Sequence, residues 1–445
     1  MVFLAGDWER YDVKSPVMPN RLLVRGARQL LTLRGSGTPR RGAELGDLSI
    51  IENGAMLVEN GRVTAVGPAS RIENLTAARR AEELHVRGRV VMPGFIDGHT
   101  HLLYAAPRLD DFAMRISGRS YEEIAAAGGG IASTVRKVRR ASQSTLRGQA
   151  LRELWRMASC GTTTVEAKSG YALDAAGELR CLRVLASLEG EPLEIVPTFL
   201  GAHAVPPEFE GRPDAYIDYL IAEVMPAVAA RKLARFADVY CDRNAFSLPQ
   251  ARRYLEAARR FGFELRLHAA QFADIGAVAL AVELGARSVD HLERIDPAVI
   301  PVLARSNTVA TLLPGSVLFL GGSHYAPARA LIEAGAAVAL ATDYNPGTSP
   351  MWNMQMAVAL ACTQLRMTPA EAITAATVNA AHSLGIADRT GTLEAGKQAD
   401  FVVMDVTDYR EIGYYFGANL AVTTVKNGRI LNPPDEVVIN GKEAG

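Results

Sequence analysis

Short runs in which apolar and polar residues alternate occupy both ends of the chain. Such alternation is typical of strands that bury one face of a sheet. Asn60-Gly61 and Asn427-Gly428 lie within these runs, and Asn-Gly favours a two-residue hairpin because both residues tolerate a positive φ. We therefore predict a small discontinuous β-sandwich domain built from residues 1–92 and 391–445. The runs are residues 21–25, 54–67, 83–91, 399–406 and 420–431.

Between these ends, apolar runs of strand length alternate with helical stretches rich in Ala, Leu, Arg and Glu. Eight such repeats predict an α/β fold, a (β/α)8 TIM-like barrel over residues 93–390, with its site at the carboxyl ends of the strands. A doubly wound open sheet is the alternative. It is disfavoured because no GxGxxG follows the first run and because polar residues end many different strands. The runs are residues 90–97, 162–167, 193–200, 236–241, 263–268, 288–291, 308–313 and 337–343.

The composition is that of an ordinary globular protein. The chain has 445 residues, 49% of them hydrophobic, and its 48 Lys and Arg balance its 48 Asp and Glu. Binding to nucleic acid or to an acidic membrane needs clustered positive charge, so we expect neither. We find no signal peptide or membrane-spanning run, and the four cysteines show no CxxC spacing, so we expect a cytoplasmic protein.

Five of the eight histidines, and one aspartate, stand at or just after the predicted strand ends. Residues two apart on a strand point the same way, so the first two project together into the barrel mouth. Imidazoles and a carboxylate at converging strand ends are a ligand set for Zn²⁺ or iron with an open position for water. Each histidine taken alone could equally be a buried or surface residue. The residues are His99, His101, His203, His268, His291 and Asp343.

Longer motifs carry a family resemblance. Residues 93–101 resemble the first-strand signature of the amidohydrolase superfamily, and residues 391–402 resemble the segment with which its members return to their β domain. Further motifs are similar to the imidazolonepropionase family of histidine degradation. That resemblance implies hydrolysis of the cyclic amide of 4-imidazolone-5-propanoate to N-formimidoyl-L-glutamate. These motifs are residues 127–131, 165–171, 197–206, 313–315 and 341–350.

The resemblance implies a metal-dependent hydrolase with His99, His101, His268 and Asp343 as ligands. A bound divalent ion lowers the pKa of water towards neutrality, which is what opening a cyclic amide requires. Asp343 is also expected to take a proton from the water and pass it to the departing nitrogen.

We assign His291 to polarising the carbonyl oxygen or stabilising the oxyanion. The alternative is a structural histidine tied to Asp290 or Glu293.

One metal is expected rather than two. Binuclear relatives carry a bridging carboxylated lysine at the end of strand four, where this chain reads Asp238-Val-Tyr-Cys-Asp. Lys168 lies on strand two, so we expect it to pair with Glu166 or another carboxylate.

The substrate of this family is an anionic heterocycle, and Arg108 can grip a carboxylate with two hydrogen bonds. The alternative for Arg108 is an exposed arginine beside Asp110 and Asp111, and residues 345–348 could equally be a plain turn. By resemblance, the other substrate-binding positions are Tyr171, His203, Gln271, Asn345, Gly347 and Thr348.

The chain departs from the family after His268, where many members have an acidic residue at the position of Ala270 and Glu or Gln at the position of Gln271. Gln271 cannot act as a base. A related mononuclear amidohydrolase acting on another small heterocycle, either a cyclic amide hydrolase or an aromatic deaminase, therefore stays open. A non-enzymatic scaffold is disfavoured because the whole ligand set is present. The resemblance also suggests a homodimer, and Gly128–Gly130 is either a lid hinge or a simple connection.

Overall fold

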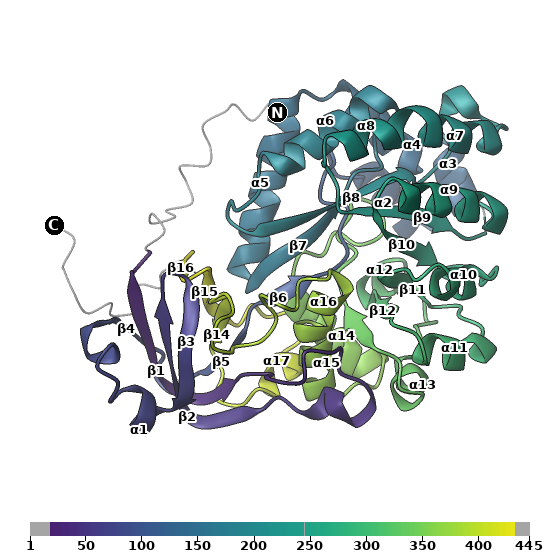
Figure 1. Cartoon of the computed structure of the whole chain (residues 1–445). Coiled ribbons are helices and arrows are strands. Elements are labelled where there is room, and N and C mark those ends of the chain that lie inside the picture. Colours follow the sequence, from purple (N-terminus) through teal and green to yellow (C-terminus); the bar gives the residue numbers. More distant parts are fainter. Residues whose placement is uncertain (1–17, 244, 432–445) are drawn as a thin grey trace.

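A computed structural model describes residues 18–243 and 245–431 of the chain. It contains an eight-stranded parallel sheet rolled into a barrel and a separate eight-stranded mixed sheet (Figure 1). The predicted fold class is confirmed. The outer ends of the predicted β domain, residues 1–17 and 432–445, lie outside the described residues, so its boundaries stay a prediction.

The barrel strands follow one another around the barrel in chain order from β6 to β13. The barrel closes where the chain leaves its first and last strands: His101 N donates to Tyr344 O (2.8 Å) and Asp343 N donates to His99 O (3.1 Å). The strands are β6 (Phe95–Asp97), β7 (Thr162–Lys168), β8 (Glu194–Ala202), β9 (Phe236–Cys241), β10 (Glu264–Ala269), β11 (Ser288–His291), β12 (Val309–Leu312) and β13 (Val338–Leu340).

Helices separate these strands in the chain and cover the outside of the barrel (Figure 1). They are α2 (Leu109–Ile116), α3 (Tyr121–Ala126), α4 (Gly130–Arg140), α5 (Gln143–Ser159), α6 (Ala175–Ala186), α7 (Pro213–Tyr219), α8 (Met225–Ala230), α9 (Leu248–Arg260), α10 (Ala277–Glu283), α11 (Ile300–Ala304), α12 (Pro314–Phe319), α13 (Ala328–Glu333), α14 (Met354–Gln364), α15 (Pro369–Ala375) and α16 (Val378–Ser383).

The first predicted barrel run, residues 90–97, is two strands in the structure. Residues up to Pro93 form β5 (Val90–Pro93) in the mixed sheet, and the barrel begins with β6 after Gly94. A Cβ at Gly94 would lie 2.2 Å from Thr163 Cγ2, so only glycine allows the chain to cross between the sheets here. The run is continuous in hydrophobicity because both of its halves are buried.

The mixed sheet joins the two ends of the described chain. The strand order is β16-β15-β14-β5-β1-β2-β3, with β4 paired to β1. Its remaining strands are β1 (Arg21–Leu31), β2 (Ile50–Glu59), β3 (Arg62–Pro68), β4 (Glu82–His85), β14 (Phe401–Met404), β15 (Ala421–Lys426) and β16 (Arg429–Ile430). The short helix α1 (Ala69–Ile72) packs against β2 and β3, whereas α17 (Glu411–Tyr414) packs against the barrel helices α14 and α15.

Both predicted Asn-Gly hairpins are confirmed. Asn60 and Gly61 join β2 to β3 with φ of 49° and 76°, and Asn427 and Gly428 join β15 to β16 with φ of 50° and 74°. The two turns touch, since a Cβ at Gly61 would lie 2.5 Å from Asn427 O. The sheet therefore curls until its two ends meet, and it encloses an apolar cluster drawn from both ends of the chain.

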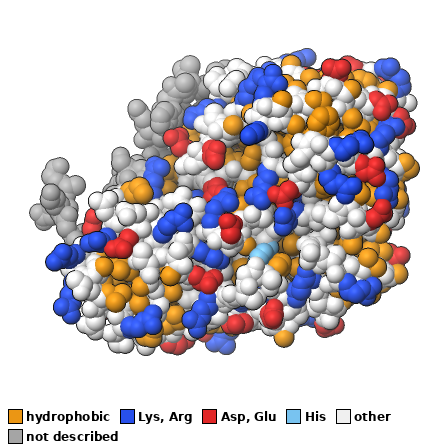
Figure 2. Space-filling view, viewed as in Figure 1, with side chains coloured by type: hydrophobic (Ala, Val, Ile, Leu, Met, Phe, Trp, Pro, Cys, Tyr) orange, Lys and Arg blue, Asp and Glu red, His pale blue; other side chains and the backbone are white. Residues whose placement is uncertain are grey.

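Among the described residues, no helix is long and apolar enough to cross a membrane. On the face shown in Figure 2, cationic and anionic side chains are interspersed, in keeping with the balanced formal charge.

Candidate metal centre

Three strand ends bring the four predicted ligands together inside the barrel. His99 and His101 follow β6, His268 lies on β10 and Asp343 follows β13; all four are buried. Asp343 Oδ1 lies 3.7 Å from His99 Nε2 and 3.6 Å from His101 Nε2. His99 belongs to two groups of residues whose possible ligand atoms all lie within 4.8 Å of one another. One group contains His101 and Asp343, and the other contains His268 and His291.

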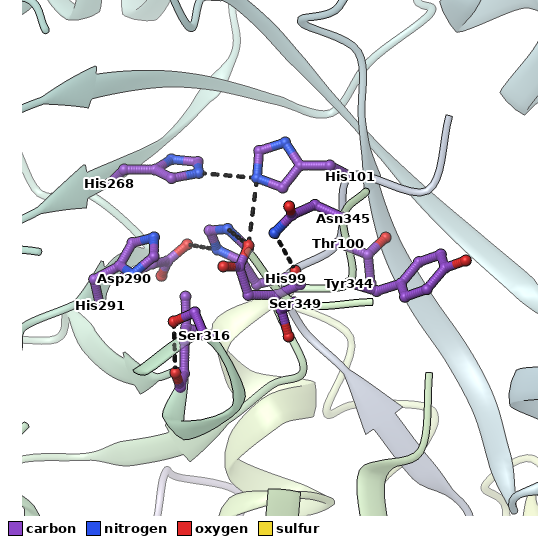
Figure 3. Close-up of polar contacts among 12 residues, drawn as sticks. His99, Thr100, His101, His268, Asp290, His291, Ser316, Tyr344, Asn345 and Ser349 are labelled. Carbon is purple, nitrogen blue, oxygen red and sulfur yellow. Dashed lines mark hydrogen bonds and ion pairs between the residues drawn. The ribbon is translucent and has the colours of Figure 1, made fainter. Parts of the chain in front are cut away.

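The free ring nitrogens face one another in a way that suits a cation. His268 Nε2 and His101 Nε2 are 3.2 Å apart (Figure 3). His99 Nε2 is buried and has no hydrogen-bond partner among the described residues. Buried polar atoms are normally satisfied, so an unpaired imidazole nitrogen beside a carboxylate fits a divalent metal ion. The residues present therefore form a candidate divalent-metal site.

Asp290 fixes the ring of His99. His99 Nδ1 lies 2.7 Å from Asp290 Oδ2, which leaves Nε2 free to coordinate a metal ion (Figure 3). Arg266 Nη2 donates to the same oxygen (3.0 Å), and Ser288 Oγ donates to Oδ1 (2.7 Å). From the sequence, Asp290 was expected only as a partner for His291, and Arg266 was missed. The available signal was a charged residue two positions before His268 in a buried strand.

Asp238 fixes the ring of His268. His268 Nδ1 lies 3.1 Å from Asp238 Oδ1, and Lys168 Nζ lies 2.9 Å from Asp238 Oδ2. Lys168 Nζ also donates to Glu166 Oε1 at 2.9 Å. The predicted pairing of Lys168 is thus confirmed with two carboxylates. Asp238, whose importance was missed, is a charged residue inside the otherwise apolar β9.

Burial decides the charge of the ligands. It lowers the pKa of His99 and of His101 well below the ordinary value, so both rings are neutral, as metal coordination requires. Burial also raises the pKa of Asp343 to about 6, although nearby imidazoles oppose that shift. His101 differs from the other two histidines because its Nδ1 has no hydrogen-bond partner among the described residues.

His291 stands beside the ligands and is paired with Glu293. Its Nδ1 lies 3.5 Å from Glu293 Oε1, and its ring centroid lies 5.4 Å from that of His268. Burial lowers the pKa of His291, but Glu293, Asp343 and Asp290 together outweigh burial and raise this pKa to about 9. The sequence offered Asp290 and Glu293 as structural partners of His291. Glu293 contacts His291, whereas Asp290 contacts His99.

Residues at three of the strand ends, those of β10, β11 and β13, have left-handed backbone conformations. His291 has φ 87°, Asp343 has φ 55° and Ala270 has φ 55°. Side chains other than glycine rarely adopt such angles, and strain of this kind gathers at functional sites. The turns are therefore held by tertiary contacts.

Arg108, Tyr171 and His203 line one side of the centre. His203 stacks on His101 (4.9 Å between centroids), and its Nδ1 lies 2.9 Å from Gly170 O. Arg108 lies over the Tyr171 ring at 5.9 Å, and Arg108 Nε donates to Thr134 Oγ1 (2.7 Å). Arg108 Nη2 is buried without a hydrogen-bond partner among the described residues, so it can still bind an anion.

The loop after Asp343 organises itself. Asn345 Oδ1 accepts from the backbone N of Gly347 (2.8 Å) and of Thr348 (2.7 Å), and Asn345 Nδ2 donates to Asp343 O (2.7 Å). A Cβ at Gly347 would lie 2.1 Å from Arg108 Nη1, so glycine makes room for that guanidinium. These contacts support the prediction that residues 345–348 form a turn. In this turn, Thr348 Oγ1 lies 3.5 Å from Asp343 Oδ2.

Gln271 follows β10 and is oriented by residues of the neighbouring strand, β9, and of the turn after it. Tyr240 OH donates to Gln271 Oε1 (2.8 Å), which engages the acceptor end of the amide. Asp242 holds the turn that carries Gln271 by accepting from its backbone N (2.7 Å). Farther out, Gly128 (φ 86°) lies between α3 and α4, and Gly130 (φ 70°) is the first residue of α4; the role of this segment as a hinge stays a prediction.

Comparison with known proteins places this site in a family. Residues 90–443 match the model of the amidohydrolase family, which is about four-fifths of the chain. The chain therefore belongs to the amidohydrolase family.

Within that family, curated relatives indicate a narrower group. An imidazolonepropionase from Symbiobacterium thermophilum is 44% identical over 93% of this chain and 97% of its own length. One from Solibacter usitatus is 48% identical over 88% of this chain and 93% of its own length. By these matches the chain is a member of the imidazolonepropionase group.

Solved structures agree on the fold. Escherichia coli guanine deaminase superposes with a TM-score of 0.70 at 17% identity, covering 93% of this chain and 99% of its own. A zinc-bound adenosine deaminase from Xanthomonas campestris gives 0.67 at 18%, covering 95% and 94%. At these identities the likeness concerns the fold alone.

Proposed function

We propose that this chain hydrolyses the cyclic amide of 4-imidazolone-5-propanoate to N-formimidoyl-L-glutamate, as the names of its relatives indicate. The observation that carries the proposal is the cluster of His99, His101, His268 and Asp343 at one end of the barrel. We assign these four residues as ligands of one Zn²⁺ or iron ion, which supplies an activated water and polarises the amide carbonyl.

The remaining steps belong to the chain's own groups. Asp343 takes a proton from the attacking water while the water oxygen bonds to the carbonyl carbon. Asp343 then gives this proton to the ring nitrogen when the C–N bond breaks. His291 donates a hydrogen bond to the carbonyl oxygen as negative charge develops there. Arg108 binds the propionate, and its buried unpaired Nη2 supports this role.

We assign the other predicted positions, Tyr171, His203, Gln271, Asn345, Gly347 and Thr348, to the walls of the substrate site. Gln271 can offer its Nε2 to the ring because Tyr240 engages its oxygen. Asn345 and Gly347 act by shaping the loop that carries Asp343.

The test is turnover of 4-imidazolone-5-propanoate by metal-loaded protein, followed by mass spectrometry as the gain of one water. We expect Asp343→Ala to abolish conversion, and Arg108→Met to act mainly by raising KM. Arg152→Met, on the outer helix α5, is the control and should match the wild type. Elemental analysis of the purified protein distinguishes zinc from iron and tests for one ion per chain.

No conversion by a protein that holds one metal ion would contradict the proposal. Ala270 and Gln271 would then direct the search to other cyclic amides and to aminated heterocycles. The homodimer and the cytoplasmic location stay predictions, to be tested by light scattering and cell fractionation.

A further inference from the structure

A buried ammonium group lies beneath the metal centre, and the mechanism above does not use it. The side chains of Lys168, Glu166 and Asp238 are all 0% exposed. Lys168 Nζ is 2.9 Å from a carboxylate oxygen of each partner. Burying three charges is costly, so this cluster is weak evidence for stability and calls for another role.

The free oxygen of each carboxylate reaches a different part of the ligand set. Asp238 Oδ1 lies 3.1 Å from His268 Nδ1. Glu166 Oε2 accepts from the backbone N of Thr100 (3.1 Å), the residue between His99 and His101. One ammonium therefore connects the ligand on β10 to the pair that follows β6.

The backbone reinforces this link. Lys168 N donates to Thr100 O (3.0 Å), and Thr100 Oγ1 donates to Glu166 O (2.6 Å). The segment from His99 to His101 is thus attached to β7 through both its backbone and the Thr100 side chain. A shift of Lys168 would move this segment relative to His268.

We propose that Lys168 is a positioning residue: held between Glu166 and Asp238, it sets the place of the segment from His99 to His101 and the ring orientation of His268 for metal binding. The inference rests on the proposed metal centre. Partners of this kind, one step removed from the metal, typically change its affinity 10–100-fold when they are removed.

The chain offers a matched control. Lys426 of β15 is also buried and also bridges two carboxylates, with its Nζ 2.8 Å from Glu194 Oε2 and 2.8 Å from Asp400 Oδ2. Among the described residues, neither carboxylate forms a hydrogen bond or ion pair with a residue of the metal site; Asp400, for example, accepts from Thr390 Oγ1. Lys426→Met therefore removes a buried ammonium from between two carboxylates away from the site, although Glu194 keeps its ion pair with Arg389.

The experiment measures Zn²⁺ affinity by competition with a chromophoric chelator, together with the visible spectrum of the Co²⁺-loaded protein. We expect Lys168→Met to weaken Zn²⁺ binding about 10–100-fold and to shift the Co²⁺ bands. Lys426→Met should stay within about twofold of the wild type and keep its spectrum. Equal affinities and spectra in folded Lys168→Met and wild-type protein would overturn the proposal.

A double-mutant cycle tests the path through Asp238. If Lys168 acts through that carboxylate, Lys168→Met should add little to the loss caused by Asp238→Asn. Fully additive losses would overturn the proposed path.

Glu166→Gln covers the case in which Lys168→Met does not fold, because it keeps Lys168 and Asp238 while weakening the link to Thr100. It should also weaken Zn²⁺ binding, and wild-type affinity in that variant would overturn the proposal. Because no substrate enters these measurements, a wild type that binds Zn²⁺ but leaves the imidazolone ring intact would count against the proposed function alone.

Discussion

Lys168 in the barrel and Lys426 in the mixed sheet are built from the same parts, yet their surroundings differ. Each is a buried ammonium between two carboxylates, at 2.9 Å in the barrel and 2.8 Å in the sheet. Burial lowers the pKa of each lysine, but the carboxylates outweigh it and raise both above the ordinary value. The charge motif alone therefore does not distinguish the two sites.

The difference lies in what the carboxylates touch next. In the sheet, Asp400 accepts from Asn427 N (2.8 Å), and Glu194 on β8 pairs with Arg389 and Lys426, so that cluster joins the sheet to the barrel. In the barrel, the carboxylate oxygens that do not contact Lys168 contact the metal site instead. Asp238 Oδ1 lies beside the His268 ring, and Glu166 Oε2 accepts from the backbone N of Thr100. The same motif therefore joins two sheets at one place and orients ligands at the other.

The largest expected effect is the loss of stability when either lysine becomes methionine. Lys168→Met should lower the free energy of unfolding of the metal-free protein by about 3–5 kcal/mol, because it leaves two buried carboxylates without their cation. Lys426→Met should cost about 3 kcal/mol, the lower end of that range, because Glu194 keeps its ion pair with Arg389. Urea denaturation followed by circular dichroism measures this. A loss below about 1 kcal/mol in only one variant would break the equivalence of the two clusters.

Metal addition should then separate the two variants. Metal at about a thousand times its dissociation constant should raise the wild-type free energy of unfolding by about 4 kcal/mol. Lys426→Met should keep this gain, whereas Lys168→Met should lose about 1.4–2.7 kcal/mol of it, the equivalent of 10–100-fold weaker binding. Melting with and without Zn²⁺ tests this, and equal gains in both variants would count against a special role for Lys168.

Acid should weaken the sheet cluster through Glu194. Burial raises the pKa of this carboxyl, but Lys426 and Arg389 outweigh burial and lower it below the ordinary value. A depressed pKa contributes stability above the unfolded-state pKa, and that contribution is lost as the pH falls through the folded-state value. Glu194→Gln should therefore cost about 1.5 kcal/mol near neutral pH and progressively less in acid. A difference that does not change between pH 7 and pH 3 would refute this account.

The smallest expected effect concerns two hydroxyl groups. Thr100 Oγ1 donates to Glu166 O at 2.6 Å, whereas Thr164 Oγ1 lies 3.5 Å from Lys426 Nζ. Thr100→Val should cost about 1 kcal/mol and Thr164→Val less than half of that. Zn²⁺ affinity should stay within about twofold of the wild type in both variants, because valine keeps the backbone N that Glu166 accepts from. A tenfold loss in Thr100→Val would show that the hydroxyl group itself positions the ligands.

Much of the fold could be predicted because its signals are local. The Asn-Gly turns and the period-two alternation depend on neighbouring residues, and the structure confirms the hairpins at Gly61 and Gly428. The placement of His99 and Asp343 at strand ends could be predicted because they follow the first and the eighth apolar runs of the chain. The break at Gly94 was missed because hydrophobicity does not change where the chain passes from one buried sheet to another.

The sequence by itself therefore determined the elements, the barrel and the residue types that gather at one end of it. Only the tertiary structure decided which charge serves which ring. His268 contacts Asp238, which is 30 positions away in the chain, and His99 contacts Asp290, which is 191 positions away. Such pairs depend on the closure of the barrel, and hydrophobic patterning records which side chains are buried without recording which of them face each other.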